Sequence, residues 1–203
     1  MEISETELAL LSSYAASEMV GGLILGHAAR RTEDPDMRYK LILHCAEETS
    51  HGSLWALTIK ALGGLPLVAH DEGKKHYFTK AGEITSDIEL LVFLQCFERL
   101  VPWHFSMHAL RKNCHPKVKE TIDTMIKDEI GHLSWTKKKL DKLKEDGRGE
   151  EVDALMKKYI DLTIEVFEDE VARMRNSGNE ELKEFAAIID EHWPQAKHDL
   201  YDR

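Results

Sequence analysis

The sequence has only three cysteines in 203 residues, Cys45, Cys96 and Cys114, and no two of them form a CxxC pair. A disulfide framework pairs its cysteines, and an iron centre held only by thiolates needs four of them. The number and spacing of the cysteines therefore exclude both kinds of site.

The sequence also lacks a long uninterrupted hydrophobic run. Polar or charged residues break every apolar stretch before it reaches about 20 positions, the length of a membrane-spanning helix. The first residues, MEISETELAL, are acidic and lack the basic region that opens a secretory signal. We therefore expect a cytoplasmic protein with no membrane partner.

Positive charge is scarce, because 27 basic residues face 37 acidic ones and the formal net charge is -10. Such a charge repels phosphate backbones, which makes nucleic acid an unfavourable partner. The basic run TKKKLDKLK at 136–144 is the local exception. It would dock an acidic carrier or RNA, or form a solvated helix face, and the sequence favours the solvated face.

No segment shows the alternating pattern of a strand, whereas apolar residues recur at helical spacing throughout. The sequence therefore predicts an all-α protein. Four long helices are expected at 4–31, 35–62, 86–113 and 116–146, with a fifth at 150–175 and a short sixth after NSGN at 176–179. Start signals support the first four: the capping boxes SETE and SDIE, the pair Asp34-Pro35, and Pro116.

The composition, 42% apolar and 32% charged, is that of a globular chain, and its length favours a single domain, 1–203. Short connections predict that the first two helices form one antiparallel hairpin and the next two another. The stretch 63–85 between the hairpins could span about 70 Å if extended, more than the roughly 40 Å length of a helix here. It could cross a four-helix bundle and leave the second and third helices parallel. Residues 147–203 would then form a helical extension.

A Glu-x-x-His pattern occurs twice, at Glu48–His51 and at Glu129–His132. Residues three apart share one face of a helix. One such pair alone is a weak signal, since it is more often a surface pair. Of the eleven histidines, however, only these two follow a glutamate at this spacing.

Each pair has an opposing glutamate embedded in apolar sequence. Glu18 precedes Glu48 by 30 residues, and Glu98 precedes Glu129 by 31. In an antiparallel hairpin, these separations place the two glutamates opposite each other near the middle of their helices. Four carboxylates and two imidazoles would thus gather inside the bundle.

This ligand set resembles that of the ferritin-like di-iron carboxylate superfamily, in its rubrerythrin or bacterioferritin type, over residues 4–146. The resemblance implies two metal ions bridged by Glu48 and Glu129, with no catalytic residue beyond the ligands. Oxygen donors with two imidazoles suit Fe, with two Mn or mixed Mn/Fe as alternatives. The implied metal ligands are Glu18, Glu48, His51, Glu98, Glu129 and His132.

Members of this superfamily often place an acidic residue just before the bridging glutamate, where it orients a metal-bound histidine. Glu47 and Asp128 occupy those positions. The resemblance implies that Asp128 orients His51. It implies likewise that Glu47 orients His132. The alternative is that both acids form the polar flank of their helices.

Two further polar residues lie one turn before a ligand. Tyr14 precedes Glu18, where it would bond a ligand, relay electrons or serve as a buried structural tyrosine. His44 precedes Glu48 and faces the same way. It would be a core histidine more readily than a seventh ligand.

Proline and glycine residues near the implied ligands predict open space beside these ligands. Pro102 lies four residues after Glu98 and removes the helical donor to its carbonyl, so a kink is expected. Gly21, Gly22 and Gly26 follow Glu18, where they would let helices approach closely or leave a cavity.

An apolar substrate pocket would be lined by Phe97, Val101 and Phe105 opposite Gly22, although core packing explains the same residues. The glycine-rich stretch 63–85 would serve as its lid. The extension after the bundle would cover one side of the pocket or form a homodimer interface.

Superfamily members store iron, remove peroxide, or use O2 to oxidise organic substrates. Rubrerythrin-like peroxide reductases usually add a four-cysteine iron domain, and ferritins stay close to the bare bundle. The extended chain is more similar to the small di-iron oxygenases, and we expect an O2-dependent oxidase or oxygenase of a small or medium organic substrate. It would need an external electron donor, such as a ferredoxin or flavin reductase. Ferroxidase or iron storage, dimanganese catalase, and a metal-free interaction module remain alternatives.

Overall fold

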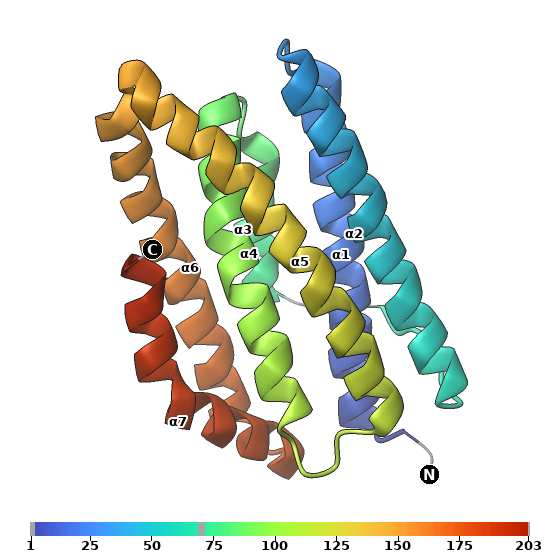
Figure 1. Cartoon of the computed structure of the whole chain (residues 1–203). Helices are drawn as coiled ribbons and strands as arrows, with labels where there is room; N and C mark the ends of the chain where they lie inside the picture. The colour runs from blue at the N-terminus through green and yellow to red at the C-terminus, as the bar shows by residue number, and fades with distance from the viewer. Residues whose placement is uncertain (1–2, 69–71, 203) are drawn as a thin grey trace. The chain divides into compact units, whose positions relative to one another are not determined.

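The computed structural model describes residues 3–68 and 72–202, with the side chains of 72–76 left out. Every regular element in these two stretches is a helix, which confirms the predicted all-α class. The chain divides into two compact units, Met1–Glu83 and Ile84–Arg203, which are described separately (Figure 1). A four-helix bundle with one crossover would require both units, so it stays a prediction, as does the single domain.

Unit 1 contains α1 (Glu5–Arg31), α2 (Pro35–Ala61) and α3 (Glu72–Glu83). The first two lie side by side as the expected antiparallel hairpin (Figure 1). The third occupies half of the stretch that the sequence predicted as a plain crossover. Its apolar residues, such as the buried Tyr77 and Ala81, were too few for its periodicity to be recognised in a stretch with four glycines.

Unit 2 contains α4 (Asp87–Ala109), α5 (Pro116–Leu143), a π-helical segment (Lys144–Arg148), α6 (Gly149–Arg175) and α7 (Glu180–Tyr201). The chain turns at Gly147, whose φ of 86° lies in the left-handed region that glycine adopts without strain. The predicted break at this position is therefore confirmed. The expected short sixth helix is wrong in length, because α7 has 22 residues.

Side-chain caps explain where the helices begin. Ser4 accepts a hydrogen bond from the backbone N–H of Glu7 at 3.1 Å, and Asp34 accepts one from Asp36 at 2.9 Å. These bonds satisfy N–H groups that have no partner inside a helix. The N-cap residues are Ser4, Asp34, Ser86, His115 and Asn179.

The C-terminal helices complete the core of unit 2. Phe167 of α6 and Trp193 of α7 contact each other at a ring-centroid distance of 4.6 Å, and Trp103 of α4 packs on both. Arg111, which follows the end of α4, forms an ion pair with Glu181 of α7 at 3.2 Å. The last two helices therefore pack on α4 instead of forming a detached tail.

Helix α4 continues through Pro102 without interruption from Asp87 to Ala109. The backbone does not unwind there. The predicted kink stays a prediction.

Helix α1 is the one helix in the described stretches that is long and apolar enough to cross a membrane, by length and composition alone. A core helix of a soluble protein passes the same test. Leu11, Leu25 and Ala28 of this helix are fully or almost fully buried. The expectation of a chain without a membrane span stays a prediction.

Glycines set the close approach of α1 and α2. A Cβ added at Gly22 would lie 2.7 Å from Thr49 Cγ2 and 3.3 Å from the carbonyl oxygen of Cys45. Thr49 cannot easily turn away, because its hydroxyl donates to that same carbonyl at 3.0 Å. Of the two alternatives for these glycines, the structure supports close approach over a cavity.

We predict that Gly22→Ala lowers the free energy of unfolding by about 1–3 kcal/mol, because the added methyl overpacks the α1–α2 contact. Gly131→Ala in α5 is the matched control, since a Cβ there meets nothing within 4 Å. It should raise stability by about 0.5–1 kcal/mol through better helix propensity. Urea unfolding followed by circular dichroism measures both. Equal effects of the two variants would contradict the close approach.

Candidate metal centre

Unit 1 brings together its three predicted ligands. Glu18 comes from α1, and Glu48 and His51 come from α2; their side chains are 6%, 5% and 3% exposed. One ligand atom of each lies within 4.8 Å of those of the others. His51 Nδ1 is 3.7 Å from Glu18 Oε2. Unit 1 therefore contains half of the expected centre.

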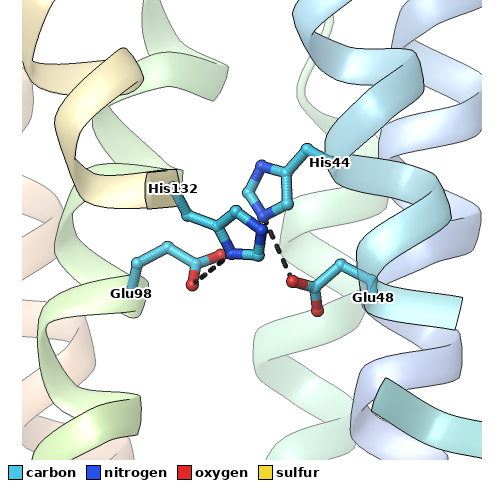
Figure 2. Close-up of side chains that lie close together, drawn as sticks. All are labelled: His44, Glu48, Glu98 and His132. Atoms are coloured by element: carbon cyan, nitrogen blue, oxygen red, sulfur yellow. Dashed lines mark hydrogen bonds and ion pairs between the residues drawn. The ribbon is translucent and has the colours of Figure 1, made fainter. Parts of the chain in front are cut away.

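Two features of unit 1 act on Glu48. His44 Nε2 lies 3.1 Å from Glu48 Oε1, and both side chains are buried (Figure 2). A Cβ on Gly21 would lie 3.1 Å from Glu48 Oε2, so the glycine leaves room for the carboxylate. His44 therefore contacts a predicted ligand.

Unit 2 brings together its own three predicted ligands in the same way. Glu98 of α4 and the α5 pair, Glu129 and His132, are at most 3% exposed. His132 Nδ1 lies 3.7 Å from Glu98 Oε2 (Figure 2). It also lies 3.2 Å from Glu129 Oε2. Each hairpin thus places the Nδ1 of its Glu-x-x-His histidine at the same distance from a carboxylate oxygen of the facing helix.

The acids of unit 2 control the charge of His132. Burial lowers the pKa of the imidazole, but the hydrogen bonds and charges of Glu129 and Glu98 outweigh burial and raise this pKa to about 12. The imidazolium then compensates part of the negative charge that the two buried carboxylates carry.

A polar pair that the sequence analysis missed continues the site. Thr136, one turn after His132, donates its hydroxyl hydrogen to Gln95 Oε1 at 2.7 Å, and it also lies 3.0 Å from the carbonyl oxygen of His132. Both side chains are buried. Their positions were recognisable, because Gln95 lies three residues before Glu98 and shares its face of α4.

The residues predicted to support the ligands differ in their burial. Tyr14 is 3% exposed and packs on Trp55 at a centroid distance of 5.3 Å, which supports a structural role. Glu47 and Asp128 are exposed. Their predicted bonds to histidines would join the two units, so these bonds stay predictions.

The predicted pocket residues also belong to two units. Phe97 is half-buried and stacks on Phe93 with an interplanar angle of 5°, Val101 is half-buried, and Phe105 is buried. Gly22 lies at a close helix contact. A pocket shared by these residues stays a prediction.

The donors fit the implied ions. Each unit offers two carboxylates and at least one imidazole, all buried, which is the oxygen-rich set that Fe or Mn binds. The carboxylates of both halves together match the charge of two divalent cations.

Comparisons with protein-family models, with curated proteins and with solved structures find no match to this chain.

The cysteines lie outside both half-sites. Burial raises the pKa of the Cys96 thiol to about 12, although the charge of Arg99 opposes this shift. Cys114 is also buried, whereas Cys45 is half-buried. A thiolate is the reactive form of cysteine, so Cys96 should be inert in the folded protein.

We therefore predict that Ellman's reagent at pH 8 modifies Cys45 first. Cys96 and Cys114 should react only as fast as the protein unfolds, and denaturant should abolish the difference. Cys45→Ser removes the fast phase, and Cys96→Ser should leave it unchanged. Three equal rates in the native protein would contradict the described burial.

Proposed function

We propose that this chain binds two iron ions through the two half-sites and is an O2-dependent di-iron oxidase or oxygenase of a small or medium organic substrate. The observation that carries the proposal is the repeated half-site: in each hairpin, a buried glutamate from one helix faces a Glu-x-x-His pair from the next, at the same 3.7 Å distance. An accidental pair would not be expected twice with equal geometry and burial.

The proposed ligand roles follow from position. Glu18 and His51 would hold one ion, and Glu98 and His132 the other. Glu48 and Glu129 would complete the ligand set with two further carboxylates. Bound iron would supply the redox chemistry that O2 reduction requires, and an external ferredoxin or flavin reductase would supply the electrons.

The protein groups would keep these ligands in place before the ions arrive. His44 holds one oxygen of Glu48, and Gly21 leaves space for the other. Thr136 and Gln95 fix the backbone of α5 one turn beyond His132. A ligand whose orientation is fixed in advance loses less conformational entropy on metal binding.

The test is anaerobic Fe(II) titration of the purified chain with metal analysis. We predict two irons per wild-type chain and loss of both in Glu48→Ala, because the resemblance implies that this carboxylate bridges them. Glu120→Ala, an exposed glutamate on α5, is the control and should retain both. Absence of stoichiometric metal in the wild type would overturn the proposal. Retention of one iron in Glu129→Ala would mean that the half-sites act separately.

Oxygen consumption then separates the reaction classes. O2 uptake that depends on an added reductase and rises with an organic compound supports the oxygenase. Ferric mineral that accumulates without any organic substrate would support ferroxidase chemistry, and peroxide dismutation after Mn(II) loading would support a catalase. A metal-free interaction module predicts instead that Glu48→Ala and Glu129→Ala are neutral or stabilising and bind no less metal than the wild type.

We further predict that His44→Phe weakens iron binding by about 10–100-fold, the usual cost of losing a residue that orients a metal ligand. His104→Phe is the matched control, since it also removes a buried imidazole, one that stacks on Phe185 in unit 2. Equilibrium dialysis with Fe(II) measures both. Equal losses in the two variants would assign His44 to packing alone.

A further inference from the structure

A pocket of about 130 Å³ lies within unit 2, among α4, α5 and α7. The short side chain of Ala196 on α7 leaves space there between two ligand-bearing helices and the C-terminal helix. The lining residues are Arg99, Leu100, Trp103, Leu133, Ala196, Asp199 and Leu200.

This pocket is separate from the half-site of unit 2. At about 100° per residue, Arg99, Leu100 and Trp103 lie roughly 100–200° around α4 from Glu98. They therefore face away from the carboxylate. A molecule in the pocket would not reach the proposed irons directly, and the site goes beyond the proposed function.

The size of the pocket limits its ligand. A cavity of about 150 Å³ in another protein, lined by aliphatic and aromatic side chains, binds benzene. The present pocket is slightly smaller and has Trp103 and three leucines in its wall. This volume matches one aromatic ring.

The charges of the pocket limit the ligand further. Arg99 donates from Nη1 to the carbonyl oxygen of Leu200 at 3.2 Å, which fixes the guanidinium at the pocket wall. Asp199 accepts from Gln195 at 2.8 Å and adds the opposite charge. A pocket with one cation and one anion favours a neutral ligand that can both donate and accept a hydrogen bond.

A ligand has access to the pocket, because five of its seven lining residues are only half-buried. These five residues are Arg99, Trp103, Leu133, Ala196 and Asp199. We propose that this pocket binds a small neutral molecule with one aromatic ring and one hydroxyl or amide group. Phenol is the simplest such probe.

Calorimetric titration of the metal-free chain with phenol tests the proposal independently of iron. We expect saturable binding of one phenol per chain and about tenfold weaker binding of toluene, which has a methyl group in place of the hydroxyl. Ala196→Leu should fill the pocket and weaken phenol binding at least tenfold. Ala187→Leu is the same change at an exposed position of α7 and should leave binding unchanged.

A gain of binding separates pocket filling from misfolding. Leu133→Ala should enlarge the pocket and bind 2-naphthol at least tenfold more tightly than the wild type does. Arg99→Met should lower phenol binding to the level of toluene. Absence of saturable phenol binding in the folded wild type would overturn the proposal, as would equal phenol affinities of Ala196→Leu and Ala187→Leu.

The results also separate this site from the proposed function. Phenol binding without stoichiometric iron would retain the pocket and overturn the di-iron proposal. Iron binding without phenol binding would retain the di-iron proposal and overturn the pocket.

Discussion

The burial of carboxylates inside two helical hairpins is the constraint on which the rest of the structure depends. Glu18, Glu48, Glu98 and Glu129 are each at most 6% exposed. A buried charge costs several kcal/mol unless a partner compensates it, so these acids need compensating side chains or a bound cation. The histidines supply part of it. His132 meets both glutamates of its hairpin, and the two acids raise its pKa to about 12.

Helix packing around these acids differs between the two hairpins. In unit 1, glycines bring α1 and α2 so close that a side chain at Gly22 would collide with Thr49. In unit 2, α4 carries no glycine, and α6 and α7 cover it with aromatic residues such as Phe167 and Phe185. Close approach of the α1 and α2 backbones therefore positions one half-site, and aromatic packing of α6 and α7 on α4 positions the other. The C-terminal helices are needed because the apolar α4 has more than one face to bury.

The sequence predicted the features that depend on local rules. Helical periodicity and the caps at Ser4, Asp34 and Ser86 located most helices to within a few residues, and the Glu-x-x-His spacing picked out the buried acids and histidines that each unit brings together. It missed α3, whose apolar residues are few, and it missed the length of α7. It also missed the pocket at Ala196, since that space arises only when α7 packs on α4 and α5. A gap between helices depends on long-range packing and leaves no periodic signal in the chain.

The two half-sites are alike in their ligands but unequal in what surrounds them. One turn before its Glu-x-x-His glutamate, α2 carries His44, whereas α5 carries the apolar Met125. Unit 1 therefore offers two imidazoles for two carboxylates, and unit 2 offers one. Both half-sites carry two carboxylates, so the extra imidazole leaves the carboxylate charge unchanged and adds a hydrogen-bonding partner for Glu48. A pair of metal ions bound as proposed would therefore meet equal carboxylate charge but unequal support, because His44 holds Glu48 from its own helix whereas the thioether of Met125 cannot donate a hydrogen bond to Glu129.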